Sequence, residues 1–200
     1  MIFMISAAVI SYLLGSVNPA LLISKYIYNT DIRSEGSGNP GATNMTRVLG
    51  KKAGAVVFFL DFSKGLIAAA AAKCLVYFFD APYETVLIAG LFVQLGHIFP
   101  VFFKFKGGKG VATAAGAAVA IMPLTAVILL SAFAVITALT KTVSLASATC
   151  AAAYPLLALF LSGSNATLHF MFAAACSVLI IIKHTSNIRR LLDGEEKPIK

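Results

Sequence analysis

Residues 1–24 read MIFMISAAVISYLLGSVNPALLIS, and they contain no charged side chain. A helix of about 20 apolar residues spans the hydrocarbon core of a bilayer, which is about 30 Å thick. A secretory signal peptide needs a basic segment before its apolar run and a small-residue cleavage site after it. Neither feature is convincing here, so we expect a retained transmembrane helix in this stretch.

The composition extends this expectation to the whole chain. Of 200 residues, 59% are hydrophobic and only 12% are charged, with a mean hydropathy of +0.89. About a quarter of the residues in a soluble domain are charged, so a soluble fold is excluded. We predict one integral-membrane domain over residues 1–200. The cysteines lie in apolar runs without metal-ligand spacing and indicate no metal site: Cys74, Cys150 and Cys176.

Turn signals divide the chain into seven apolar runs, which predict an all-α polytopic membrane helix bundle of seven transmembrane helices. The runs are 3–23, 53–79, 85–103, 111–122, 124–140, 143–161 and 166–183. The fourth and fifth share residues 111–140, which can form two short spans or one kinked helix. We adopt two short spans, because this choice agrees best with the charges.

Basic residues predict the orientation. With the N-terminus outside and the C-terminus in the cytoplasm, 14 of the 16 Lys and Arg residues lie in inner loops or in the tail. These are Lys25, Arg33, Arg47, Lys51, Lys52, Lys104, Lys106, Lys109, Lys141, Lys183, Arg189, Arg190, Lys197 and Lys200. Lys and Arg concentrate on the cytoplasmic side of membrane proteins. The net charge of +8 therefore indicates orientation and contact with anionic membrane lipids rather than a nucleic-acid partner.

The segment RSEGSGNPGATNMTR, residues 33–47, is the most polar part of the chain. Its glycines permit positive φ and close backbone approach: Gly36, Gly38 and Gly41. The side chains that offer hydrogen bonds are Ser37, Asn39, Thr43 and Asn44. Arg47 ends the segment with a guanidinium suited to phosphate or carboxylate. A solvated linker with a helix cap is the alternative interpretation.

A second segment, FKFKGGKGVAT at 103–113, combines glycines with lysines before an apolar run. A glycine-rich turn and the following helix N-terminus can bind an anion through backbone N–H groups. The candidate residues are Lys104, Gly107, Gly108, Lys109 and Gly110. The spacing is not that of a Walker A loop, so ATP is disfavoured. A positive-inside anchor explains the lysines but not the glycines.

Polar residues outside these loops have simpler explanations when taken alone. In KHTSNIRRLLDGEE, residues 183–196, His184 and Asn187 are three apart and share a helix face within an amphipathic tail. Asp61 and Lys64 are one helical turn apart inside a span, where we expect a mutual ion pair. Ser144 and Ser147 open the sixth span, where capping or bonding back to the preceding turn is the ordinary role.

These segments together resemble the signature regions of the bacterial membrane glycerol-3-phosphate acyltransferases that use acyl phosphate as donor. The similarity is carried by GSGNPGATNMTR, GHIFPVFFKFKGGKGVAT and HTSNIRRLLDGEE, joined by FFLDFSKG and VSLAS. It extends from about residue 12 to residue 196, with three motifs in the family's order. The resemblance implies a seven-helix, N-out fold in the bacterial inner membrane, with the active site facing the cytoplasm.

The resemblance also implies an activity. Such enzymes transfer an acyl chain from acyl phosphate to the C1 hydroxyl of glycerol 3-phosphate. The products are 1-acyl-glycerol 3-phosphate (lysophosphatidic acid) and inorganic phosphate, in the first step of phospholipid biosynthesis. Neither coenzyme A, acyl carrier protein nor another cofactor is implied.

By the same resemblance, the family's functional residues fall on particular positions. The catalytic and phosphate-binding ones are Ser37, Arg47, Gly107, Gly108, Lys109, Gly110, Ser144, Ser147, His184 and Asn187. The family's structural glutamate falls on Glu196 if its G-x-E spacing is followed, and the adjacent Glu195 is the alternative. The sequence leaves open which substrate phosphate Arg47 and Lys109 each hold, the acyl-chain preference and the oligomeric state.

Other glycerolipid acyltransferases use a His with an Asp five residues later. No such pair occurs here, since Phe102, Ala174 and Arg189 follow the three histidines at that spacing. We therefore expect no obligatory protein general base. A transporter of a phosphorylated metabolite and a membrane phosphotransferase are the rival functions. The first would normally show repeated halves, and the second would normally want acidic metal ligands.

Overall fold

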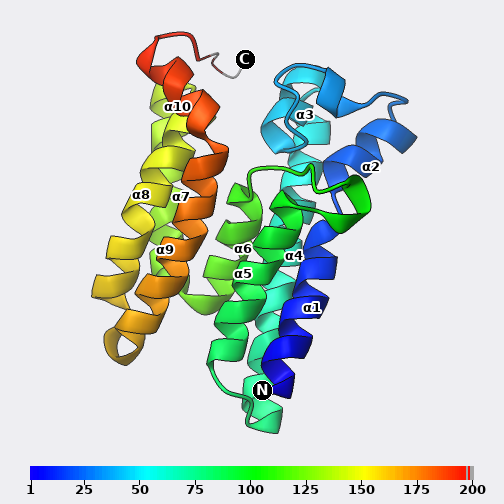
Figure 1. The fold of residues 1–200 in the computed structure, drawn as a ribbon. Helices are drawn as coiled ribbons and strands as arrows, with labels where there is room; N and C mark the ends of the chain where they lie inside the picture. Colours follow the sequence, from blue (N-terminus) through cyan, green and yellow to red (C-terminus); the bar gives the residue numbers. More distant parts are fainter. Residues whose placement is uncertain (197, 199–200) are drawn as a thin grey trace. The chain divides into compact units, whose positions relative to one another are not determined.

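The computed structural model describes residues 1–196 and 198, and every regular element in that part of the chain is a helix (Figure 1). Six helical segments are long and apolar enough to cross a membrane: Ile2–Tyr26, Lys51–Phe79, Glu84–Phe103, Pro123–Thr140, Val143–Leu161 and Gly163–Lys183. The all-helical membrane class is therefore confirmed. Lys197 and Lys200, two of the basic residues used to predict the orientation, lie outside the described residues.

The fourth predicted span is a shorter helix than the others. It forms α6, Val111–Ile121, which has 11 residues and a length of about 16 Å at 1.5 Å per residue. Met122 then leaves the helical conformation, with φ −134° and ψ 72°, and Pro123 begins α7, Pro123–Thr140. Residues 111–140 therefore form two helices rather than one kinked helix.

The first predicted span is not one continuous helix. It consists of α1, Ile2–Ser16, and α2, Pro19–Tyr26. Asn18 caps α2 by accepting a hydrogen bond from the N–H of Leu21 at 3.1 Å, and Pro19 occupies the first helical position. Asn before Pro is a helix-start signal, so the break is a local property of the sequence VNPA.

The chain separates into two compact units, Met1–Ile121 and Met122–Lys200, which we describe separately. The first unit contains α1 and α2, the short helix η1 (Ile32–Ser34), α3 (Ala42–Leu49) and α4 (Lys51–Phe79). It continues with α5 (Glu84–Ile98), the short helix η2 (Val101–Phe103) and α6. The single domain expected over residues 1–200 stays a prediction.

Glycines bring the helices of the first unit into close contact. Along α1 and α5, a Cβ on Gly15 would overlap the backbone of Val93, and one on Gly96 would overlap the backbone of α1. Gly65 and Gly116 bring α4 and α6 together in the same way. Small residues allow such backbone contact between membrane helices. This packing holds α5 against α1 and α6 against α4. The glycine-rich loop connects the end of α5 to the start of α6.

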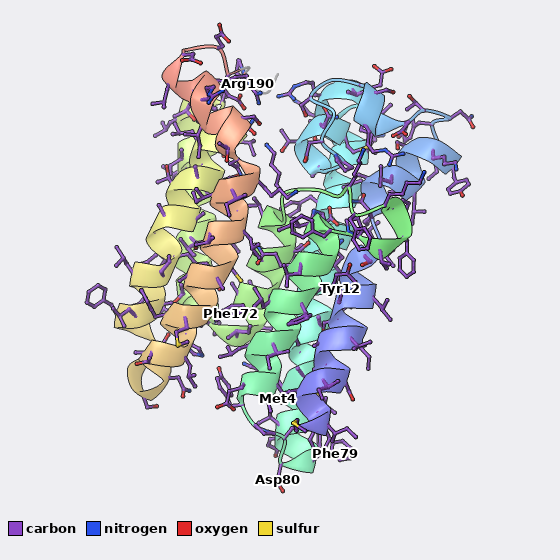
Figure 2. All side chains as sticks on the ribbon, in the orientation of Figure 1. Met4, Tyr12, Phe79, Asp80, Phe172 and Arg190 are labelled. Carbon is purple, nitrogen blue, oxygen red and sulfur yellow. The ribbon has the colours of Figure 1, made fainter. Side chains whose placement is uncertain are left out.

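The second unit is built around α8, Val143–Leu161, which packs along α7 and along α9, Ala166–Lys183. A short helix, η3 (Gly163–Asn165), joins α8 to α9. Tyr154 and Phe172, the latter labelled in Figure 2, meet edge to face with ring centroids 6.4 Å apart. The last helix, α10 (Thr185–Leu192), follows α9 directly and also packs on α8.

Candidate functional site

The polar residues predicted from the sequence fall into two groups, one in each unit. Residues of the 33–47 segment and of the glycine-rich loop belong to the first unit, together with Asp61 and Lys64. Ser144, Ser147, His184, Asn187 and Glu196 belong to the second. We describe each group within its own unit.

Asn44 organises the 33–47 segment from inside. Its side chain is buried, at 1% exposure. The Oδ1 atom accepts a hydrogen bond from the N–H of Ser37 at 2.8 Å, and Nδ2 donates to the carbonyl oxygens of Ile32 at 3.2 Å and Glu35 at 2.9 Å. These three bonds hold the loop in shape. Asn44 therefore positions Ser37, and its expected role in binding phosphate stays a prediction.

The glycines of this segment allow the turns that the sequence predicts, at two of the three positions. Gly36 and Gly38 have φ of +59° and +71°, whereas Gly41 has φ −154°, which is ordinary extended backbone. Gly41 immediately precedes α3 as its N-cap residue. The positive φ values turn the chain around Ser37, whose side chain is exposed.

Helix α3 presents the remaining polar side chains of this segment. Thr43 and Arg47 are four residues apart and therefore lie on one face of the helix; Arg47 is exposed and Thr43 half-buried. On the opposite side, Met45 is fully buried in a core cluster with Ile32 and Val57. Because α3 buries Met45 on its apolar face, Arg47 on the other face is left on the surface. Asn39, which precedes this helix, is half-buried.

The glycine-rich loop is held by the end of α5. The N–H groups of Gly107 and Gly108 donate to the carbonyl oxygens of Ile98 at 3.2 Å and of His97 at 3.1 Å. Carbonyl oxygens of the chain therefore accept both of these hydrogen bonds, and the expectation that Gly107 and Gly108 bind phosphate stays a prediction. Gly110 has φ +80° and directs the chain into α6.

Two other groups of this loop have the charge that suits an anion. Lys109, half-buried just before α6, carries a positive charge, and the N-terminus of α6 carries the partial positive charge of its helix dipole. Lys104 is exposed on the surface with φ +55°. The loop therefore combines a lysine with a helix N-terminus, which are the groups that the sequence analysis associates with an anion site.

The two loops of the first unit meet at Pro40. Asn18 Nδ2 donates a hydrogen bond of 3.5 Å to the Pro40 carbonyl oxygen, and a Cβ on Gly108 would lie 3.1 Å from the same oxygen. The Pro40 backbone therefore contacts both the helix break after α1 and the glycine-rich loop. The structure thus brings together Pro40 and Gly108, which are 68 residues apart in the sequence.

Glu196 organises the group in the second unit. Its Oε1 accepts hydrogen bonds from Ser144 Oγ at 2.8 Å and from Asn187 Nδ2 at 2.6 Å. Its Oε2 accepts one from Arg190 Nε at 2.7 Å, and Arg190 is labelled on α10 in Figure 2. The neighbouring Glu195 side chain is exposed. Glu196, rather than Glu195, is therefore the glutamate that ties α10 to the start of α8.

Electrostatics favour the ionised form of Glu196. Burial raises its pKa, but the three hydrogen bonds it accepts and the charge of Arg190 lower it by more, so that the net pKa lies below the ordinary value of 4.5. The carboxylate is therefore charged at neutral pH and accepts all three hydrogen bonds.

His184 and Ser147 are fixed by their own helices. His184 is buried, and its Nδ1 lies 2.8 Å from the carbonyl oxygen of Ile180. A carbonyl oxygen can only accept, so Nδ1 carries the hydrogen and Nε2 bears the lone pair when the ring is neutral. Ser147 donates to Val143 O at 2.8 Å, which is the bond back to the preceding turn considered from the sequence.

A third polar group, inside the first unit, includes a residue that the sequence analysis missed. Asp61 and Lys64 form the expected ion pair, with Nζ 2.8 Å from Oδ1, and His97 joins them with Nδ1 3.1 Å from the same oxygen. The available signal was a histidine at the end of an apolar run, a few residues before the glycine-rich loop.

Comparison with known proteins shows which family this sequence resembles. A family model described as glycerol-3-phosphate acyltransferase matches residues 5–194. A glycerol-3-phosphate acyltransferase of a Thermoanaerobacter species is 44% identical, covering 98% of this chain and 96% of its own. One from Neisseria meningitidis is 41% identical, covering 98% of each chain.

Solved structures with a similar fold carry the same description. The crystal structure of PlsY (YgiH), an integral membrane glycerol 3-phosphate acyltransferase, in its glycerol 3-phosphate form has a TM-score of 0.89 and 42% identity. It covers 98% of this chain and 96% of that one. The lysophosphatidic acid form has a TM-score of 0.85 and 41% identity, with 98% and 94% coverage.

Proposed function

The chain belongs to the glycerol-3-phosphate acyltransferase family, and from this premise we propose that it acylates the C1 hydroxyl of glycerol 3-phosphate with acyl phosphate as donor. The products are 1-acyl-glycerol 3-phosphate and inorganic phosphate. The observation that carries the proposal is the family match over residues 5–194, which covers the first two polar motifs and the third up to Gly194. Coenzyme A, acyl carrier protein and other cofactors are not needed in this reaction.

Both substrates carry phosphate, and the first unit offers cations suited to it. Arg47 presents its guanidinium on the exposed face of α3, and Lys109 stands at the start of α6. Charge-assisted hydrogen bonds from such groups bind phosphate strongly. Ser37 and Thr43, from the same polar segment as Arg47, contribute hydroxyls. Acyl phosphate is already activated, so positioning and charge stabilisation supply much of the rate.

In the second unit, we assign His184 and Asn187 to orienting the substrate. The hydroxyl proton of glycerol 3-phosphate passes to a phosphate oxygen of the donor or of the departing phosphate. No protein base is then obligatory. Ser144, held by Glu196, supports Asn187 through their shared carboxylate oxygen.

The role of His184 can be tested directly, because its Nε2 bears the lone pair that a base would use. We expect His184→Ala and His184→Gln to lower turnover through lost orientation, without recovery in external imidazole. Recovery in imidazole would instead identify His184 as the base. The matched control is His169→Gln, a second buried histidine of the same unit, on α9.

The activity itself is tested by supplying the purified protein, in lipid or detergent, with glycerol 3-phosphate and palmitoyl phosphate. Release of phosphate together with 1-acyl-glycerol 3-phosphate supports the proposal, and palmitoyl-coenzyme A in place of palmitoyl phosphate should yield neither product. Glycerol 3-phosphate uptake into sealed vesicles without phosphate release would favour a transporter and contradict the proposal.

We also propose that the N-terminus lies outside and the C-terminus in the cytoplasm of a bacterial inner membrane. Seven crossings result if the short α6 counts as one. The support is the placement of basic residues in alternate loops. Single cysteines at Ser162 and at Lys141, in a cysteine-free background, should react with an impermeant maleimide from outside and from inside respectively; the reverse pattern would invert the topology.

A further inference from the structure

Three ionisable side chains lie buried together in the first unit, and the proposed chemistry does not use them. Asp61 and Lys64 come from α4 and His97 from the end of α5, with exposed fractions of 2%, 5% and 4%. Lys64 Nζ lies 2.8 Å from Asp61 Oδ1 and 2.9 Å from His97 Nδ1. Burying charges within a membrane span is costly unless they are paired, so such a cluster calls for a reason.

One side of the cluster holds the break between α1 and α2. Lys64 Nζ donates hydrogen bonds to the carbonyl oxygens of Gly15 at 3.1 Å and Val17 at 2.9 Å. Carbonyls at the end of a helix lack partners within it, and the buried ammonium supplies them. The next residue, Asn18, caps α2 and reaches the Pro40 carbonyl. Lys64 thus stabilises the turn that contacts the 33–47 segment.

The other side of the cluster holds the glycine-rich loop. The His97 carbonyl accepts the N–H of Gly108, and the next carbonyl, of Ile98, accepts that of Gly107. The Nε2 and Cε1 edge of the imidazole lies so close to Gly108 that a Cβ there would overlap the ring. The orientation of the His97 ring, set by Asp61 and Lys64, therefore determines how closely the loop can approach α5.

We infer that Asp61, Lys64 and His97 are positioning residues. They hold the 33–47 segment and the glycine-rich loop in fixed positions relative to each other. Lys64 acts through the helix break and Pro40. His97 acts through Gly108, where an added Cβ would lie 3.1 Å from the Pro40 carbonyl oxygen. The two routes meet at the same carbonyl oxygen. The consequence for catalysis rests on the proposed function, because Arg47 and Lys109 stand on the two loops that these contacts hold.

Amide hydrogen exchange tests the inference without relying on activity. In micelles, Lys64→Met and His97→Leu should speed exchange about tenfold in peptides covering Gly107 and Gly108, because the buried side-chain contacts that hold the end of α5 and the loop in place are lost. His97→Asn, whose amide can occupy the place of Nδ1, should restore most of the protection. Thr85→Val is the matched control, since Thr85 is equally buried, on α5 far from the loop, and should leave exchange unchanged.

Kinetics supply the second measurement. The same variants should lower kcat/KM for glycerol 3-phosphate about tenfold or more, as expected when binding groups are misplaced by a fraction of an ångström to one ångström. His97→Asn should recover activity in parallel with protection. A fall in kcat/KM that parallels faster exchange confined to the glycine-rich loop is the result that a merely structural effect on the bundle would not produce.

Several outcomes would overturn the inference. Wild-type exchange in the glycine-rich loop of a folded but inactive variant would indicate a direct chemical role for the cluster. Faster exchange spread evenly over α4 and α5 would indicate a packing role alone. If the single variants do not fold, the neutral pair Asp61→Asn with Lys64→Met removes both charges together, and wild-type loop exchange in it would refute the inference. If the wild-type protein releases no phosphate, the proposed function fails while the exchange data still decide on positioning.

Discussion

Replacing Glu196 by Gln is the sharpest test of the second unit, because it changes charge while almost preserving shape. The carboxylate accepts hydrogen bonds from Ser144, Asn187 and Arg190 at 2.8, 2.6 and 2.7 Å. A glutamine has one acceptor oxygen and one NH₂ group in the same places. If the oxygen still faces Asn187, the NH₂ group faces Arg190, which can only donate.

The size of the effect can be worked out from these contacts. A hydrogen bond to a charged group contributes about 1.5–3 kcal/mol, and the Arg190 bond is at the lower end because 41% of that side chain is exposed. Losing the charge on the bond from Asn187 and the pairing with Arg190 together should destabilise the arrangement by about 2 kcal/mol. If Asn187 orients substrate, kcat/KM should fall about 30-fold.

The assay is phosphate release from palmitoyl phosphate with glycerol 3-phosphate, alongside thermal unfolding of the purified protein. Glu195→Gln is the control, since it removes the same charge from an exposed neighbouring side chain and should stay within about 0.5 kcal/mol of wild type. Wild-type kinetics and stability in Glu196→Gln would refute the reasoning. An equal loss in the control would show that net charge, rather than the hydrogen-bond network, is responsible.

Three further expectations concern charge, packing and pH. Arg47→Ala and Lys109→Ala should each lower transition-state binding by at least about 2 kcal/mol in the same assay, and wild-type kinetics in both would remove them from the site. Gly108→Ala should reduce kcat/KM because its Cβ overlaps the His97 ring, whereas Gly163→Ala, in a turn with open space around it, should leave activity unchanged despite its φ of +53°. Because the pKa of Glu196 is lower in the folded protein than its ordinary value of 4.5, the ionised carboxylate stabilises the fold at pH values above 4.5. This stabilisation should be lost as the pH falls from 4.5 through the lowered pKa of the folded state. In Glu196→Gln, unfolding between about pH 6 and pH 3 should show that loss reduced, and an unchanged pH dependence would contradict the assignment.

Much of the fold was accessible from the sequence because membrane helices depend on local properties. An uncharged or nearly uncharged run long enough to cross a bilayer must satisfy its backbone hydrogen bonds internally, so it forms a helix. The predicted runs 143–161 and 166–183 coincide with α8 and α9. The helix break before Asn18 could also have been predicted, since Asn-Pro is a helix-start signal. The apolar residues on both sides of it favoured a single continuous helix instead.

The candidate site was less accessible, because a polar residue type does not specify its partner. Asn44 could bind phosphate or the loop backbone, and its side chain forms three bonds to the backbone. Gly107 and Gly108 could direct their N–H groups to an anion, but the end of α5 accepts both hydrogen bonds. In each case the competing partner was an ordinary carbonyl or amide, which leaves no motif in the sequence.

By itself, the sequence determined the membrane class, the positions of the apolar helices, the polar loops and the resemblance to an acyltransferase family. Each follows from the length, charge and order of contiguous residues. Only the tertiary structure decided that Glu196 bonds Ser144, 52 residues away, and that Lys64 joins His97, 33 residues away. Such partners are selected by helix packing, because glycine contacts such as those of Gly15 and Gly65 bring distant backbones within reach.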